Sequence, residues 1–419
     1  MTNDARRIYW GWYVVLAAFL IMGVNYGVRY CFGIFIKPMA EEYHWSRSVI
    51  SAGMSILIIG YGFGGIFSGR LIDRIAPRWL ITAGAMLAAG GLFLTVLVRE
   101  PWQFYLTYGV CAGMGSSCFG VVVCNSSVAK WFDRKRGLAV GLASVGVGVW
   151  MMVLSPLAGY LVKLYDWRVG FIAMGCAYLL LPVGLAQWLM GRTKPEDYGL
   201  APDGERNAAA GAPAAPAVEP AEPSPALGPI LKDSRFWILA ACYSVAFLAE
   251  MAALVHQVPY ALDRQIDKVA AASTLGMVGI ASIVGRFFFG WLADRLKDAK
   301  RASSLGFLCM ALGMVLLLLA SSAKVLFIYA VIFGFGYGSM STLMPYLLAD
   351  RFGRRALGSI YGMLTFCISL SGALGPVVAG YIYDLRGSYT AAWLLNLGLL
   401  IVVTFLILTM KPGEANGGG

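Results

Sequence analysis

The sequence predicts an all-α membrane protein with twelve transmembrane helices in two six-helix bundles. Three observations predict this fold. Of the 419 residues, 59% are hydrophobic and only 13% are charged, about half the ~25% that is usual in a soluble domain. Twelve stretches are apolar enough to cross a bilayer, and motifs of the first half recur in the second. So few charges exclude a disordered chain and argue against a water-soluble enzyme.

The twelve expected spans follow from their length, because a helix that crosses a bilayer needs about 20 mostly apolar residues. Most tryptophans fall at the ends of these stretches, where the amphipathic ring prefers the membrane interface. The stretches are 9–36, 48–70, 79–98, 102–130, 137–162, 167–191, 235–262, 269–292, 302–321, 324–349, 356–383 and 388–410.

The basic residues predict the orientation. Of the 33 lysines and arginines, 22 lie in the terminal tails and every second loop, 9 in the other loops, and two, Arg29 and Arg286, within spans. Basic loops favour the cytoplasmic side. We therefore expect a multi-pass protein of the cell (inner or plasma) membrane with both termini cytoplasmic. The net charge of +11 is explained by this topology, so no nucleic-acid partner is expected.

Residues 192–234 interrupt the apolar pattern with a polar segment followed by an Ala/Pro/Glu-rich run. Such a composition cannot bury enough apolar surface to fold, which is typical of a flexible linker. We expect an N-terminal six-helix bundle in 1–191, a cytoplasmic linker in 192–234 and a C-terminal six-helix bundle in 235–419.

The two halves repeat the same motifs. GRLIDR, which begins at Gly69, recurs as GWLADR from Gly290, and WFDRKRGLAVGL, which begins at Trp131, is echoed by RFGRRALGSIYG from Arg351. Both pairs are separated by nearly the same number of residues. A duplicated six-helix unit with a site between the halves is the build of secondary transporters.

These motifs resemble known families. The paired G-x-x-x-D-R loops are similar to the signature of the major facilitator superfamily. The first helix (YWGWYVVLAAFLIMGVNYGVRYCFGIFIKPM) and the junction WFDRKRGLAVGLASVGVGV resemble the two signatures of the monocarboxylate transporter family. The segments VHQVPYA and SIVGRFFFGWLADR resemble bacterial members of that family and the related oxalate–formate antiporters.

Ionisable groups inside a membrane are costly, so each is a functional hypothesis. Arg286 cannot lose its proton, and its planar guanidinium matches a carboxylate in a bidentate fashion. The resemblance implies that Arg286 binds the substrate carboxylate; the alternative is a permanent ion pair with Glu250. His256, whose ordinary pKa is about 6.5, is expected to contact the substrate or to carry a coupled proton. Glu250 is the other candidate for carrying the proton.

The chain departs from the resembling families at two positions. Arg29 stands where the eukaryotic members of the monocarboxylate transporter family carry a lysine near the outer gate. Ser282 stands where the family often carries an acid one turn before the arginine of the eighth helix. The resembling oxalate-binding relatives carry a lysine in the eleventh helix, whereas 356–383 contains no lysine or arginine. The resemblance therefore favours a substrate with one negative charge, unless Arg29 supplies a second cation. Further residues expected to line the site are Tyr26, Val28, Phe119 and Tyr337.

The repeated loops suggest a separate role in gating. Carboxylates near helix N-termini and arginines near carbonyl ends can latch neighbouring helices. We expect such latches at Asp73 and Arg74 in the first half and at Asp294 and Arg295 in the second.

The expected function is proton-coupled symport of a small monocarboxylate, such as lactate or pyruvate, by alternating access in a monomer. The first alternative is a carboxylate exchanger of the oxalate–formate type, and a remote one is a carboxylate-sensing receptor with a transporter-like fold. No recognised catalytic motif is present, so an enzyme is not expected. The eight cysteines form no CxxC pair, and neither a metal nor a cofactor is expected.

Overall fold

The computed structural model describes residues 9–411 except 73, 133–134, 192–194, 196–229, 297 and 353–356. The described part is helical, without a strand, and contains twelve helical segments long and apolar enough to span a membrane. The all-α class and the twelve expected spans are confirmed. Most of the expected linker, 192–234, lies outside the described residues.

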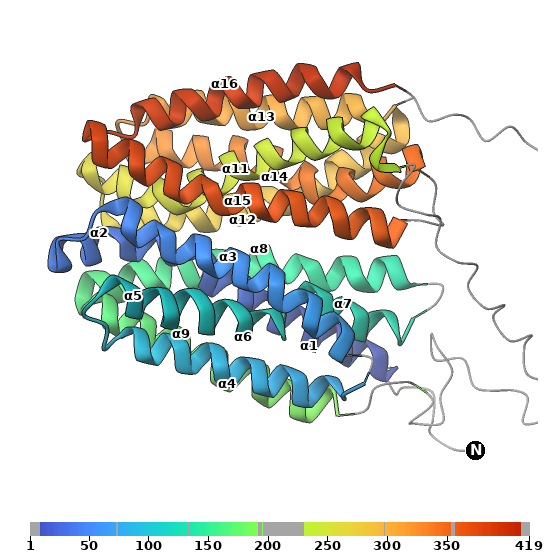
Figure 1. Cartoon of the computed structure of the whole chain (residues 1–419), viewed down its shortest axis with the longest axis horizontal. Helices are drawn as coiled ribbons and strands as arrows, with labels where there is room; N and C mark the ends of the chain where they lie inside the picture. The colour runs from blue at the N-terminus through green and yellow to red at the C-terminus, as the bar shows by residue number, and fades with distance from the viewer. Residues whose placement is uncertain are drawn as a thin grey trace, which may run out of the picture.

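The first six spans form the lower bundle in Figure 1, coloured blue to green. The first span consists of two consecutive helices and the fourth of four short segments, one of them a π-helix. In chain order the elements are α1 (Trp10–Tyr30), α2 (Phe32–Tyr43), α3 (Arg47–Leu71), α4 (Pro77–Thr95), α5 (Pro101–Phe104), η1 (Tyr105–Ala112), α6 (Gly113–Ser117), α7 (Val121–Ala129), α8 (Arg136–Leu164) and α9 (Trp167–Leu189).

The other six spans form the upper bundle, coloured yellow-green to red (Figure 1). They are α11 (Ser234–Asp263), α12 (Lys268–Arg295), α13 (Lys300–Leu318), α14 (Ala323–Phe352), α15 (Leu357–Arg386) and α16 (Thr390–Leu406), which continues into the short 3-10 helix η4 (Ile407–Thr409). Because the number of spans is even, α1 begins and η4 finishes at the same end of the molecule. We call this the terminal end and the opposite one the loop end.

The fourth span departs from the single helix expected over 102–130. It contains the π-helix η1, and the backbone is extended at Gly120 (φ −89°, ψ −167°), between α6 and α7. A break inside a span frees backbone polar groups that need new partners. The N–H of Val121 donates to the hydroxyl of Tyr61 on α3 at 3.2 Å. A side chain of a neighbouring helix therefore stabilises the break.

The first span also differs from its expected range of 9–36. It continues to Tyr43, because Cys31 between α1 and α2 keeps helical dihedral angles (φ −68°, ψ −12°). The extension brings α2 against α11 of the other half at the loop end. A Cβ added at Gly33 would lie only 2.3 Å from the carbonyl oxygen of Val255. Glycine therefore allows the close approach of these helices.

The most extensive contacts between the halves are those of two helix pairs, α8 with α12 and α3 with α15. In the first pair, a Cβ added at either Gly148 or Gly279 would lie 2.7 Å from the carbonyl oxygen of the other residue. Small residues permit such close packing between membrane helices.

This contact is lost toward the terminal end. Gly141 and Gly137 lie on the same face of α8 as Gly148, seven and eleven residues earlier, yet an added Cβ at either would meet no described residue within 4 Å. The same is true of Gly65 on α3. The two halves are therefore in contact at the loop end and diverge toward the terminal end.

Candidate functional site

Arg286 of α12 lies at the seam between the halves. Its Nη1 donates to the backbone oxygen of Ser144 on α8 at 3.2 Å, while its buried Nε has no hydrogen-bond partner among the described residues. One turn earlier, the hydroxyl of buried Ser282 donates to the carbonyl oxygen of Gly279 at 2.7 Å. Ser282 is therefore satisfied by its own helix, and the carbonyl of Ser144 is the one hydrogen-bond partner of the guanidinium among the described residues.

Glu250 of α11 faces Arg286 from the same half. Its side chain is only 1% exposed, and its Oε1 accepts no hydrogen bond from the described residues. The carboxyl group interacts electrostatically with Arg286 and with Arg29 of the first half. Within the part of the chain that the structure describes, Glu250 forms an ion-pair contact with neither arginine. The permanent Arg286–Glu250 ion pair considered from the sequence is thus not formed in this state.

Arg29 of α1 is 6% exposed and rests against aromatic rings. Its guanidinium carbon lies 4.9 Å from the ring centroid of Tyr61 and 5.7 Å from that of Tyr26. The two phenol oxygens are 3.1 Å apart. Ring faces attract a cation but do not neutralise it. Among the described residues Arg29 has no ion pair, and its Nε has no hydrogen-bond partner.

Two tyrosines connect the halves beside these charges. The hydroxyl oxygens of Tyr30 on α1 and Tyr337 on α14 lie 3.4 Å apart, and both groups interact electrostatically with Glu250. We call the five residues Arg29, Tyr30, Glu250, Arg286 and Tyr337 the central cluster. It contains two cations and one carboxylate, contributed by both halves.

The remaining expected lining residues lie in the first half. Tyr26 contacts Arg29 as described, and Val28 is buried on the same helix with 6% of its side chain exposed. Phe119 is fully buried at the break of the fourth span, where its ring packs edge-on against Tyr178 with centroids 5.1 Å apart. Its aromatic partner therefore belongs to the first bundle.

The structure places His256 near the loop end of α11, fully buried. Its Nε2 lies 2.8 Å from the carbonyl oxygen of Pro376 and 3.1 Å from the hydroxyl of Ser51, and its Nδ1 lies 2.9 Å from the hydroxyl of Tyr389. Both ring nitrogens are thus occupied by protein groups from both halves.

An arginine that sequence reasoning counted only as a loop charge organises this region. Arg47, at the start of α3, forms a bidentate ion pair with Asp263 at the end of α11, with N–O distances of 2.7 and 2.8 Å. It also donates to the hydroxyl of Tyr389 at 2.9 Å and lies 3.7 Å from the ring centroid of Tyr383. The first half is therefore bound to the second at this point.

Asp384 of α15 completes the contact. Its two carboxylate oxygens accept the backbone N–H groups of Arg47 and Ser48, each at 2.9 Å. A carboxylate at a helix N-terminus is stabilised by the unpaired N–H groups and the helix dipole. We call Arg47, His256, Asp263, Asp384 and Tyr389 the loop-end clamp. One sequence signal could have indicated Asp384, a Pro…Gly-Tyr…Asp pattern that occurs in both halves. Its residues are Pro156, Gly159, Tyr160 and Asp166 in the first half and Pro376, Gly380, Tyr381 and Asp384 in the second.

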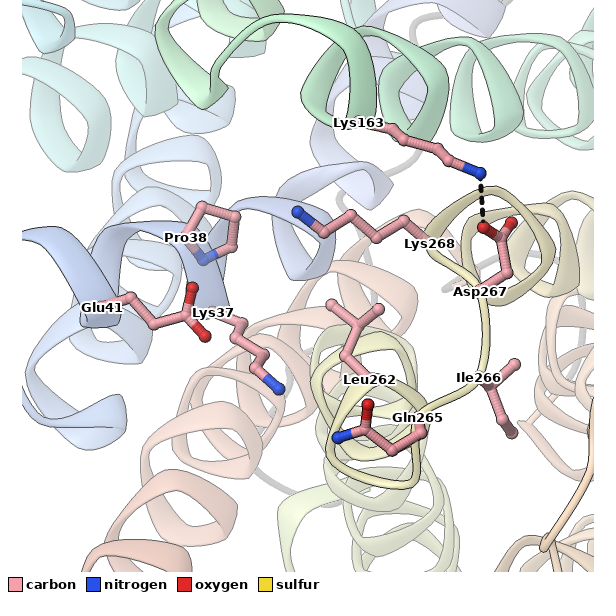
Figure 2. A pocket seen from close by; sticks show the side chains of 9 residues that line it. All are labelled: Lys37, Pro38, Glu41, Lys163, Leu262, Gln265, Ile266, Asp267 and Lys268. Carbon is pink, nitrogen blue, oxygen red and sulfur yellow. Dashed lines mark hydrogen bonds and ion pairs between the residues drawn. The ribbon is translucent and has the colours of Figure 1, made fainter.

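A hollow of about 450 Å³ adjoins the clamp and opens at the loop end. Figure 2 shows the lysines of both halves that line it, with Lys163 bonded to Asp267. Their N–O distance is 2.6 Å, and this hydrogen bond lowers the pKa of the Asp267 carboxyl. Lys37 also pairs with Asp263 of the clamp at 3.2 Å. The lining residues are Lys37, Pro38, Glu41, Lys163, Leu262, Gln265, Ile266, Asp267 and Lys268.

The expected latches lie at the terminal end, where the halves diverge. Asp73 lies outside the described residues. Arg74 and Asp294 are exposed, with no ion pair in the described part of the chain, and the guanidinium of Arg295 lies 4.7 Å from the ring centroid of Trp291.

A second charge group at this end was not expected from the sequence. Arg351 on α14 is buried and pairs with Asp298, before α13, and with its neighbour Asp350. Lys300 also lies 3.7 Å from Asp298. The group ties α14 to the start of α13 within one half.

Three comparisons identify the architecture. The sequence profile of the Major Facilitator Superfamily matches residues 18–302 and 259–418. Human Monocarboxylate transporter 2 is 28% identical over 402 residues, covering 94% of this chain and 83% of that protein. Rat (Rattus norvegicus) Monocarboxylate transporter 12 is 28% identical over 417 residues, covering 92% and 82%.

Solved structures show the same fold. A bacterial homologue of the human lysosomal transporter Spinster, in an inward-facing and unoccupied conformation, matches with a TM-score of 0.72 at 16% identity, covering 97% of this chain and 96% of that one. The inward-facing and occupied form matches with a TM-score of 0.69. With twelve apolar helices, a matching sequence profile and a matching fold, the chain belongs to the Major Facilitator Superfamily and is a multi-pass membrane transporter.

Proposed function

We propose that the chain carries a small monocarboxylate together with a proton by alternating access. The observation that carries this proposal is the central cluster, in which Arg29 and Arg286 come from opposite halves and interact with the carboxyl group of Glu250 without forming an ion pair. Buried charges without close partners are costly. An anion that enters between the halves would relieve this cost.

The charges of the cluster favour a carboxylate as the substrate. Two arginines against one acidic side chain leave a net positive charge whether or not Glu250 carries a proton, and an anion between the halves would offset it. Because Arg286 has one carbonyl partner within the described part of the chain, most of its donors are available there for bidentate recognition of the anion. The relatives named monocarboxylate transporters support this substrate class.

A coupled proton makes transport electrically neutral. A carboxylate alone would move its charge through the membrane potential, at about 2.3 kcal/mol per 100 mV. Glu250 carries the proton most directly, because it is the one carboxyl in the cluster and interacts electrostatically with both arginines. His256 is the second candidate, and the loop-end clamp surrounds it.

The basic loops favour a cytoplasmic terminal end. In this orientation the loop end faces outward and is closed, and the halves diverge toward the cytoplasm. Residues 1–191 and 235–419 act as the two moving bodies of a monomer in the cell membrane, and the hollow beside Lys37 and Lys268 lies at the outer entrance.

Uptake into proteoliposomes tests the proposal. The purified protein is given a panel of radiolabelled acids (lactate, pyruvate, acetate and oxalate) with no internal anion, with and without an imposed pH gradient. We expect an inward proton gradient to drive uptake of one or more monocarboxylates, and Arg286→Ala to abolish it. Arg264→Ala is the matched control, because Arg264 is an exposed loop-end arginine that stacks on Tyr260.

The outcomes separate the mechanisms. Uptake that requires an internal carboxylate and ignores the pH gradient would show exchange and contradict symport. Full activity of Arg286→Ala would contradict the assignment of the substrate site.

A further inference from the structure

The hydrogen bonds around His256 define its protonation state in the closed loop end. A carbonyl oxygen only accepts, so Nε2, at 2.8 Å from the oxygen of Pro376, must carry a proton. The hydroxyl of Ser51 donates to the backbone oxygen of Arg47 at 2.6 Å and therefore accepts from the same Nε2–H at 3.1 Å.

The other ring nitrogen is assigned through Tyr389. The hydroxyl oxygen of Tyr389 accepts from Nη1 of Arg47 at 2.9 Å, and its proton can then be donated to Nδ1 of His256, also at 2.9 Å. In this arrangement each donor has an acceptor. The closed clamp therefore fits the neutral imidazole with its proton on Nε2.

A second proton on the ring breaks this arrangement. Nδ1–H would face the Tyr389 oxygen, which already accepts from Arg47, and the phenol proton would lose its acceptor in the clamp. Tyr389 is only 1% exposed, so water cannot readily replace that partner, and an unsatisfied buried donor is costly. Protonation would also place a second cation beside the Arg47 guanidinium.

The other charged groups at the clamp offset this cost only in part. His256 interacts electrostatically with Arg47 of α3 and Asp384 of α15. Both oxygens of Asp384 already accept backbone N–H groups of α3. Asp263 of α11 is shared between Arg47 and Lys37 of α2. The carboxylates that would stabilise an imidazolium are thus already engaged by the closed state.

We infer that His256 is a proton-controlled switch of the loop-end gate: the neutral ring holds the two halves together, and its protonation releases them. The inference rests on the proposed transport function and deepens it: Glu250 carries the coupled proton, and protons at the loop end act on the gate through His256. Protons on the loop-end side would open that end and admit the anion. Loss of the proton would favour closure and exposure of the site at the opposite end.

Cysteine labelling tests the switch without substrate. Ser55 of α3 is 7% exposed, and its hydroxyl donates to the backbone oxygen of Ala373 on α15 across the closed seam. Ser55→Cys reports opening through reaction with a membrane-impermeant maleimide. Arg99→Cys places a cysteine at an exposed position of the same end, so its labelling corrects for the membrane side that the reagent reaches, for the reactivity of the reagent and for the effect of pH on thiols. The parent chain with its eight native cysteines gives the background labelling.

We expect the labelling ratio of Ser55→Cys to Arg99→Cys to rise about threefold or more between about pH 8 and pH 5.5, as a single group titrates. In the His256→Gln background, where no group titrates on this side chain, the ratio stays flat. An equal pH response with and without His256, or no response in its presence, would overturn the inference.

Asp263→Asn provides a test of the clamp itself. It removes the bidentate partner of Arg47 but leaves His256 in place, so the ratio should rise at every pH and still respond to acid. Unchanged labelling in Asp263→Asn would also overturn the inference. Because labelling needs no transport, failure of the switch leaves carboxylate uptake intact, whereas a pH-switched gate without any carboxylate uptake would reject the proposed function alone.

Discussion

Gly148 of α8 and Gly279 of α12 lie so close across the two halves that a Cβ added to either would come within 2.7 Å of the carbonyl oxygen of the other. Backbone atoms cannot move aside as a flexible side chain can. The contact therefore determines how closely the two bundles approach near the middle of the molecule.

Gly148→Ala tests this contact. We expect the substitution to separate the helices, lower the melting temperature by several degrees and slow uptake, since a core overpacked by one methyl group costs about 1–3 kcal/mol. Gly141→Ala is the matched control on the same face, where an added Cβ comes within 4 Å of no described residue. Equal effects of the two substitutions on melting and uptake would show that the close contact is unimportant.

Arg286→Lys tests whether the guanidinium geometry matters beyond its charge. A lysine keeps the positive charge but cannot bind a carboxylate in a bidentate fashion. We expect substrate affinity, measured by equilibrium binding of the transported acid, to fall about 10- to 100-fold, in line with the ~1.5–3 kcal/mol of a charge-assisted hydrogen bond. Unchanged affinity would mean that charge alone suffices and that the carboxylate meets Arg286 without the fork.

Glu250→Gln tests the carboxyl group of the central cluster. The amide keeps the shape but removes a negative charge that competes for Arg29 and Arg286. We expect the monocarboxylate to bind about tenfold more tightly, a gain of roughly 1.4 kcal/mol, while acid no longer accelerates uptake through this residue.

Glu41→Gln is the control for this substitution, because Glu41 is an exposed carboxyl at the loop-end hollow. The measurements are substrate binding and the pH profile of the initial uptake rate. Proton-driven uptake that survives in Glu250→Gln would contradict a role for Glu250 in proton coupling.

Asp294→Asn tests the terminal-end latch. In the present state the halves diverge at this end, and Asp294 is exposed without an ion pair among the described residues. We expect its partner contact to form only when the terminal end closes. The substitution should then change the maximal uptake rate several-fold, with little change in the substrate concentration for half-maximal uptake.

Asp267→Asn is the comparison, since Asp267 lies at the opposite end and pairs with Lys163 across the seam that is closed in this state. If Asp294→Asn altered affinity and left the maximal rate unchanged, the latch would be rejected.

The fourth span shows where local patterns stop predicting the backbone. The hydropathy of 102–130 predicts one helix, yet the chain contains a π-helix and an extended residue at Gly120. The glycines of this span permit such a break, but glycine also occurs in the unbroken helices. What stabilises the break is the hydroxyl of Tyr61, which reaches Val121 from another helix. That contact has no counterpart in the local sequence.

The buried ionisable residues likewise separate what the local sequence shows from what only the fold determines. A charge inside an apolar stretch is visible in the sequence, so Arg29, Glu250, His256 and Arg286 could all be singled out. Their grouping could not be, because it depends on which helices adjoin. His256 and Glu250 lie on one helix six residues apart, yet His256 contacts residues of the loop-end clamp and Glu250 belongs to the central cluster.

The sequence by itself determined the twelve spans, the duplicated halves and the presence of costly charges inside the bilayer, because burial in lipid acts on each stretch of about 20 residues separately. Only the tertiary structure decided that Arg47 meets Asp263, that two arginines share one carboxyl group, and that the loop end is the closed one. These features depend on contacts between segments some 200 residues apart and on how the two bundles pack against each other.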